Sequence, residues 1–295
     1  LLNFRLYGGK SMETYQAEVL VNERFHLSEG PVWDAETGVL HFVDIKGCTV
    51  NTYRLSDGQR TSTEVNQNVG CFALRRQGGY ILGLTAGVYL RSEDGRRIEK
   101  LTEPVYDPMT RSNDGKCDPQ GRFWCGTSDL VKGEKRGKLY LLPGDGRCIE
   151  MLDRLEISNG LGFAGDTLYF IDSARHSVDS YRLDEDTLTL HDHRVIAPIE
   201  GNMVPDGMTM DEEGMLWVCH WGGGFVGRYD PRDGRLLARV EIPASQCSSC
   251  CFGGTDMQTL FITCGAVNCP EESEAGKVFA VHLPYRGVES WKYRG

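Results

Sequence analysis

Four short segments of the chain place an oxygen-bearing side chain beside a glycine-containing turn, and together they could bind a cation. The four side chains are Glu29, Asn113, Asn159 and Asp206. Their carboxylate and amide oxygens suit Ca²⁺, Mg²⁺ or Mn²⁺, with Zn²⁺ or Fe²⁺ as further possibilities. Two buried carboxylates also need a counter-charge, which a divalent cation supplies. One Asn-Gly or Asp-Gly pair is typical of an ordinary turn, so the indication rests on the agreement of all four.

These positions recur at a regular interval, which predicts a repeat architecture. When two intervening units are included, the aligned positions of successive units lie about 40 to 47 residues apart, the period of a four-stranded propeller blade. The inner strands of a propeller surround a central channel, so equivalent residues of different blades can face one another. Six units fit the chain, and their aligned positions are Glu29, Val69, Asn113, Asn159, Asp206 and Phe252.

Most of the chain after Val32 alternates between short apolar strands and turns. Runs rich in β-branched and aromatic residues, such as 39–45, 123–127 and 167–172, predict strands. Turn signals such as Asp57-Gly58 separate these runs, and no long amphipathic helix is expected. The sequence therefore predicts an all-β fold, a six-bladed β-propeller with four-stranded blades around a central channel. Six generic hairpins in a sandwich are the alternative.

The predicted propeller occupies residues 12–295 as a single domain. The segment 17–21 is expected to supply the outer strand of the last blade and so close the ring. Residues 1–11 are interpreted as an N-terminal extension, with Met12 as the expected natural start. They do not resemble a secretory signal, because their apolar stretch is too short and no small-residue cleavage site follows.

Composition limits the classes of partner. A formal net charge of −10 on 295 residues argues against nucleic acid as a partner. No apolar run approaches the roughly 18 residues of a membrane helix, so no membrane is expected. The 11 cysteines are an odd number without zinc-type spacing. Reduced thiols and a cytoplasmic location are therefore predicted.

Longer motifs surround the four oxygen-bearing residues. They are Ser28-Glu29-Gly30-Pro31-Val32-Trp33, Arg111-Ser112-Asn113-Asp114-Gly115-Lys116, Gly121-Arg122-Phe123-Trp124-Cys125-Gly126-Thr127, Ser158-Asn159-Gly160-Leu161, Pro205-Asp206-Gly207-Met208 and Cys251-Phe252-Gly253-Gly254. In combination they resemble the SMP-30/gluconolactonase/regucalcin family over nearly the whole chain after Leu27. The resemblance implies a propeller hydrolase with one divalent cation in the channel, Ca²⁺ being the first choice and Zn²⁺, Mg²⁺, Mn²⁺ or Fe²⁺ the alternatives.

The resemblance also implies roles for individual residues. They are metal binding by Glu29, Asn159 and Asp206, with Asp206 also the general base, and substrate contact by Arg111 and Asn113. The implied reaction is hydrolysis of a sugar lactone, a gluconolactone-like aldonolactone, to the aldonic acid. Members often carry an acidic substrate contact after the Gly-Thr of the third blade, and here Asp129 is the candidate.

Other interpretations stay open. The chain could be a propeller hydrolase acting on another ester or an organophosphate, or a non-catalytic calcium-binding propeller. A serine nucleophile is not favoured, because no Gly-x-Ser-x-Gly elbow occurs. His220 could contact substrate, but a structural role is preferred. For the cysteines of segment 247–251, packing is preferred over a metal or redox loop.

Overall fold

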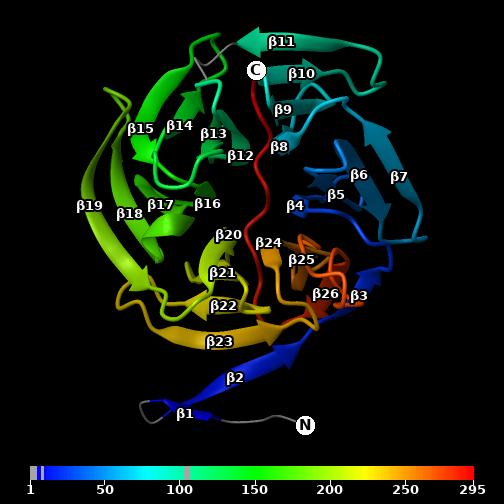
Figure 1. Cartoon of the computed structure of the whole chain (residues 1–295), viewed down its shortest axis with the longest axis vertical. Helices are drawn as coiled ribbons and strands as arrows, with labels where there is room; N and C mark the ends of the chain where they lie inside the picture. The colour runs from blue at the N-terminus through cyan, green and yellow to red at the C-terminus, as the bar shows by residue number, and fades with distance from the viewer. Residues whose placement is uncertain (1–4, 8–9, 103–106) are drawn as a thin grey trace.

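Six four-stranded antiparallel sheets stand around a central axis like the blades of a propeller (Figure 1). This arrangement, seen in a computed structural model that describes residues 5–7, 10–102 and 107–295, confirms the predicted six-bladed β-propeller. Within those ranges the one helical element is the 3₁₀ turn Ser173–Arg175. The described residues accordingly contain no helix long and apolar enough to cross a membrane.

The first three blades follow one another along the chain, and each begins with its innermost strand. Blade one consists of β4 (Ser28–Asp34), β5 (Val39–Asp44), β6 (Thr49–Arg54) and β7 (Arg60–Glu64). Blade two consists of β8 (Val69–Leu74), β9 (Tyr80–Leu84), β10 (Gly87–Arg91) and β11 (Ile98–Thr102). Blade three consists of β12 (Thr110–Cys117), β13 (Phe123–Asp129), β14 (Gly137–Leu142) and β15 (Ile149–Leu155).

The remaining blades keep the same order, except that the last one borrows a strand. Blade four consists of β16 (Ser158–Ala164), β17 (Thr167–Asp172), β18 (Ser177–Asp184) and β19 (Thr189–Pro198). Blade five contains β20 (Val204–Met210), β21 (Leu216–Trp221), β22 (Phe225–Tyr229) and β23 (Leu236–Glu241). Blade six combines β24 (Cys247–Gly253), β25 (Thr259–Cys264) and β26 (Val278–His282) with β3 (Glu18–Val21).

The N-terminal part of the chain closes the ring and then adds to its rim. Strand β3 pairs antiparallel with β26, which confirms the predicted closure by segment 17–21. Strand β2 (Lys10–Gln16) runs parallel to β23, and β1 (Arg5–Tyr7) pairs with β2. The sequence reasoning did not foresee this extra edge on blade five. Residues 1–4 and 8–9 of the predicted extension lie outside the described residues.

Blades three and five contain a buried Asp–Trp pair at equivalent places, and in each blade an arginine from a different element joins it. The Asp118 carboxylate accepts a hydrogen bond from Nε1 of Trp124 at 2.9 Å and another from a nearby arginine. The Asp211 carboxylate does the same with Nε1 of Trp217 at 3.0 Å and a second arginine. Because buried carboxylates are stable only when paired, each cluster ties the turn after the inner strand to the strands behind it.

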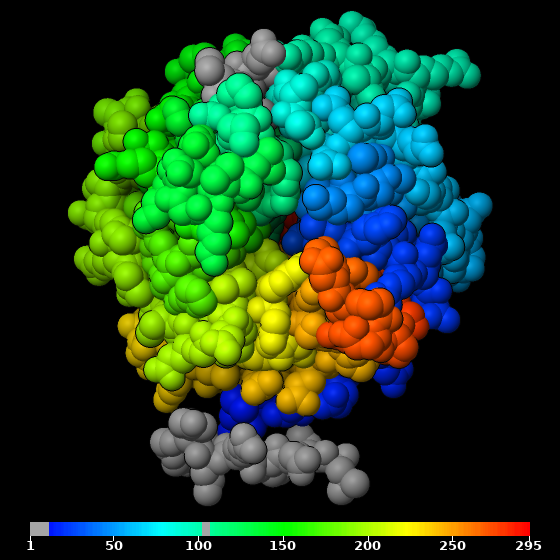
Figure 2. All heavy atoms as spheres, in the orientation of Figure 1, coloured from blue at the N-terminus to red at the C-terminus, as the bar shows by residue number. Residues whose placement is uncertain are grey.

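The C-terminal segment 284–295 crosses the ring (red in Figure 1). Its backbone N–H groups donate to blades on opposite sides, from Val288 to Met210 O of blade five at 3.2 Å and from Tyr293 to Leu74 O of blade two at 2.7 Å. These contacts lie at the ends of the inner strands, and a cavity of about 50 Å³ remains above the segment. One end of the central channel is therefore covered. The other end opens where Figure 2 shows a hollow at the middle of the ring.

Candidate metal and substrate site

Every inner strand has a break in its pairing register near its first residues. The six shifts lie between Glu29 and Val32, Val69 and Cys71, Ser112 and Gly115, Asn159 and Leu161, Pro205 and Met208, and Cys247 and Ser249. A bulge of this kind bends the strand and redirects a side chain. The predicted residues Glu29, Asn113, Asn159 and Asp206 all lie at or beside these bulges, so the structure brings them to one level of the open channel end.

The prediction for blade six was wrong in its register. Phe252 pairs with Leu260 and is buried in the apolar core, whereas the bulge of β24 lies near Ser248. The error arose because the prediction assumed the same spacing between all blades, whereas the inner strand of blade six begins earlier in its repeat. Blade six therefore has the small residue Ser248 at its bulge, where Phe252 was expected.

Glycine lets blades four and five approach each other at the axis. A Cβ atom on Gly160, the residue after Asn159, would lie 2.7 Å from the backbone oxygen of Asp206. Any larger residue would push these strands apart. The Asn-Gly pair is thus required by packing as well as by the turn.

Three carboxylates are buried at this level of the channel: Glu29, Asp206 and Asp114. Burial raises the pKa of Glu29 well above its ordinary value of 4.5, and the charges of Asp206 and Asp114 raise it further. Burial and the charge of Asp114 likewise raise the pKa of Asp206, with the Arg111 guanidinium opposing them. The sequence reasoning missed Asp114, although it adjoins Asn113 in the same bulge.

The two amide side chains are held by a chain of hydrogen bonds. Asn113 Nδ2 donates to Asn159 Oδ1 and to Ser158 O, both at 2.9 Å. Asn159 Nδ2 donates to Ser173 Oγ at 2.8 Å, and this hydroxyl donates to Pro205 O at 2.6 Å. Each amide nitrogen therefore faces protein atoms. Ser173, the first residue of the 3₁₀ turn after β17, connects Asn159 to the backbone next to Asp206.

Arg111 supplies positive charge near the buried carboxylates of Glu29 and Asp206. Its Nη1 donates to Ser112 O at 2.9 Å, and the side chain is partly exposed. Burial lowers the pKa of the guanidinium, while the charges of Glu29 and Asp206 oppose that shift. Arg111 is therefore near the candidate metal ligands Glu29 and Asp206, as the sequence analysis expected.

Asp129 lies at the end of β13 and is bound within its own loop. One carboxylate oxygen accepts the backbone N–H of Val131 at 2.9 Å, and the other accepts that of Arg136 at 2.9 Å. The Arg136 guanidinium adds an ion pair at 3.2 Å, and the Asp129 side chain has no exposed surface. Its predicted role as a substrate contact stays a prediction, and both of its oxygens already have partners.

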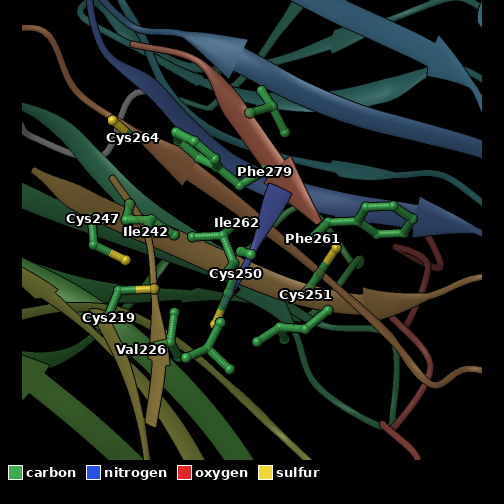
Figure 3. Packing of buried hydrophobic residues seen from close by; sticks show 14 of the residues in the cluster. Cys219, Val226, Ile242, Cys247, Cys250, Cys251, Phe261, Ile262, Cys264 and Phe279 are labelled. Atoms are coloured by element: carbon green, nitrogen blue, oxygen red, sulfur yellow. The ribbon is translucent and has the colours of Figure 1, made fainter. Parts of the chain in front are cut away.

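The other candidates of the sequence reasoning lie in the core. The ring of His220 stacks on Phe225 with centroids 4.0 Å apart, and its Nε2 lies 2.9 Å from the Tyr229 hydroxyl. Figure 3 shows Cys219, Cys247, Cys250 and Cys251 among apolar side chains of blades five and six. The eleven cysteines are free thiols. His220 and the cysteines of segment 247–251 therefore pack in the core, as the sequence analysis preferred.

A family model described as the SMP-30/Gluconolactonase/LRE-like region matches residues 27–266. The chain belongs to this family. Regucalcin of Danio rerio is 34% identical over 295 residues, covering 96% of this chain and all of that protein. Family membership agrees with the resemblance carried by the motifs around Glu29, Asn113, Asn159 and Asp206.

Two solved structures of similar proteins share the propeller. A calcium-binding protein, regucalcin, from Agrobacterium tumefaciens superposes with a TM-score of 0.89 at 25% identity, covering 96% of this chain and 99% of that one. A luciferin-regenerating enzyme gives a TM-score of 0.87 at 28% identity, covering 92% and 96%.

The residues at the open channel end fit a hard divalent cation. No ion pair within the described ranges includes the buried carboxylate of Glu29 or Asp206. The same ranges contain no group of three or more His, Cys, Asp or Glu side chains arranged to hold a metal. The predicted set differs from such a group because its third ligand is the amide oxygen of Asn159. Oxygen-only sets with two negative charges are typical of Ca²⁺ and Mg²⁺ sites.

Proposed function

We propose that this protein is a divalent-metal-dependent lactonase. The observation that carries the proposal is the pair of buried carboxylates, Glu29 and Asp206, at the open end of a channel whose other end is covered. Two such carboxylates are costly to bury in their charged forms, and a bound cation would remove that cost. Membership of a family described in part as gluconolactonase supports a lactone, in the first instance a sugar lactone, as the substrate.

In the proposed mechanism Glu29, Asn159 and Asp206 would hold the cation. When bound, it supplies positive charge that polarises an ester carbonyl and acidifies water. Asp206 would accept a proton from the attacking water, as a carboxylate placed within reach of that water can do. Arg111 would donate N–H groups to oxygens of the substrate, and Asn113 would offer its Oδ1 as an acceptor for a hydroxyl. Correct orientation supplies much of the rate in such a reaction.

The experiment that tests this function is a metal add-back assay. Protein stripped with chelator is given Ca²⁺, Mg²⁺, Mn²⁺, Zn²⁺ or Fe²⁺, and hydrolysis of gluconolactone, galactonolactone, xylonolactone and arabinonolactone is followed by acid release. We expect turnover above the spontaneous rate, with Ca²⁺ as the first choice because a similar structure is that of a calcium-binding protein. Cation binding without turnover of any lactone, ester or organophosphate would favour a non-catalytic propeller.

Replacing Ser173 by alanine should weaken cation binding about tenfold, the lower end of the range for residues that orient a ligand. The change removes the acceptor of the Asn159 Nδ2 hydrogen bond, so the amide is free to rotate its oxygen away from the channel. Isothermal titration of stripped protein measures the effect. Ser177→Ala is the matched control, because this buried hydroxyl in the same blade bonds to Asp179. Equal affinities for both variants would remove Ser173 from the site.

Cation affinity should fall as the pH is lowered. Burial raises the pKa of Glu29 above 4.5 and that of Asp206 above 3.8, so protons compete with the cation at higher pH than they would for exposed carboxylates. Affinity is therefore highest above both raised pKa values and declines as the pH falls through them. Competition with a Ca²⁺ indicator from pH 8 to pH 5.5 measures this decline. Constant affinity across that range would contradict raised pKa values.

A further inference from the structure

The innermost hairpin of blade three rises above the level of the other inner strands. Strand β12 begins three residues before Asn113, whereas β20 begins two residues before Asp206, β4 one before Glu29 and β16 one before Asn159. Its extra length is paired with β13, through Thr110 with Asp129 and Arg111 with Ser128. The end of this hairpin therefore stands beyond the candidate metal ligands, next to Arg111.

The end of this hairpin is apolar and exposed. Leu130 is 54% exposed, Met109 44% and Val131 38%, and the Leu130 N–H donates to Met109 O at 2.9 Å. These are three of the seven large hydrophobic residues that are exposed within the described ranges, and the other four are Val19, Leu55, Ile98 and Val195. Single exposed apolar residues are ordinary, but a group of them beside a candidate site indicates binding. We call Met109, Leu130 and Val131 the apolar tip.

The loop after the apolar tip is fixed in place by Asp129. Both oxygens of this carboxylate accept backbone N–H groups of the loop, from Val131 and Arg136, and Arg136 pairs with it. The hairpin therefore presents Leu130 and Val131 to the outside and keeps its acidic side chain inside. An apolar surface that is held rigid costs little entropy when a ligand covers it. In Figure 2 the green atoms of blade three lie along one side of the hollow.

We propose that the apolar tip is a specificity-determining surface that binds an apolar substituent of the substrate. The lactone ring would lie at Arg111, Asn113 and Asp206, and an alkyl chain on the ring carbon next to the ring oxygen would extend over Leu130. This inference rests on the proposed lactonase function, and it extends the substrate class from sugar lactones to lactones that carry an alkyl chain. The covered area would be that of a few methylene groups, since the tip consists of three side chains.

The test compares δ-lactones with unbranched alkyl chains of increasing length against unsubstituted δ-valerolactone and gluconolactone, using metal-loaded protein. We expect kcat/KM to rise roughly two- to fourfold for each methylene added over the first few carbons, because burying one CH₂ contributes about that factor. Leu130→Ser should lower kcat/KM for the lactone with the longest chain by at least about tenfold, so that the increase with chain length is largely lost. Leu130 is mostly exposed, so the exchange leaves the core intact.

The matched control is Val195→Ser, which removes an equally exposed apolar side chain from β19 at the outer edge of blade four. It should leave the dependence on chain length as in the wild type. A response to chain length that is lost in Leu130→Ser and kept in Val195→Ser supports the inference. Turnover that is independent of chain length, or equally altered in both variants, overturns it and leaves the lactonase function standing. No turnover of any lactone with any cation overturns the proposed function and this inference with it.

Discussion

Replacing Asp206 by alanine is expected to lower kcat/KM for lactone hydrolysis by about 10³-fold or more. This single substitution removes both a cation ligand and the base that takes the proton of the attacking water. The side chain is buried and makes no ion pair within the described residues, so its removal should not unfold the protein. Circular dichroism and thermal unfolding check the fold, and a pH-indicator assay measures turnover.

Two further variants separate the roles of Asp206. Asp206→Asn keeps a ligand oxygen but cannot accept a proton, so it should retain part of the cation affinity while losing turnover to nearly the same extent as alanine. Asp233→Ala, in an exposed turn of the same blade, is the control and should behave as wild type. Activity within about tenfold of wild type in folded Asp206→Ala would exclude Asp206 as the base.

Replacing Glu29 by glutamine is expected to have two opposite effects. Cation affinity should fall about a hundredfold or more, because a charged ligand becomes a neutral one. Without any cation the variant should be more stable than wild type at pH 8, by about 1 to 3 kcal/mol in the free energy of unfolding. The reason is that burial and two neighbouring carboxylates disfavour the charged form of Glu29.

The sign of the pH dependence follows from the raised pKa of Glu29. Below its ordinary value of 4.5 the carboxyl is neutral in both the folded and the unfolded chain, so the variant has no advantage there. As the pH rises through the raised pKa, the metal-free wild type loses stability that the variant keeps. Urea unfolding in chelator at pH 5.5 and pH 8 measures the growing difference, with Glu18→Gln on an exposed strand as control. A less stable variant at pH 8 would mean that Glu29 is stabilised without a cation.

The fold could be predicted in detail because its determinants are local and repeated. Apolar runs such as 123–127 and turns such as Asp57-Gly58 mark each strand and connection. In that turn Gly58 has a φ of 70°, and Asp57 Oδ1 accepts the N–H of Gln59 at 3.0 Å. Closure by segment 17–21 followed from the missing fourth strand of the last blade. The parallel pairing of β2 with β23 was not foreseen, because no local pattern specifies which sheet edge a terminal strand joins.

The site could be predicted only in part. Repeat phase identified Glu29, Asn113, Asn159 and Asp206, and the bulges place all four at the channel. The repeat spacing gave the wrong position for blade six, Phe252, because the blades differ in length and a bulge shifts the register of β24. Asp114 and Ser173 were missed for a different reason: their roles depend on which neighbours they face across blades, and one sequence does not contain that information. For Asp129, the sequence suggested a substrate contact, whereas the structure binds both of its oxygens within the loop.

The most direct test of a catalytic cation held by Glu29, Asn159 and Asp206 is a titration of stripped protein with Ca²⁺. Cation occupancy and gluconolactone turnover are measured on the same samples. We predict one ion bound per chain, turnover that rises in proportion to occupancy, and loss of both in Asp206→Ala. Full turnover in the stripped protein, or turnover that does not follow occupancy, would contradict a catalytic role for the cation.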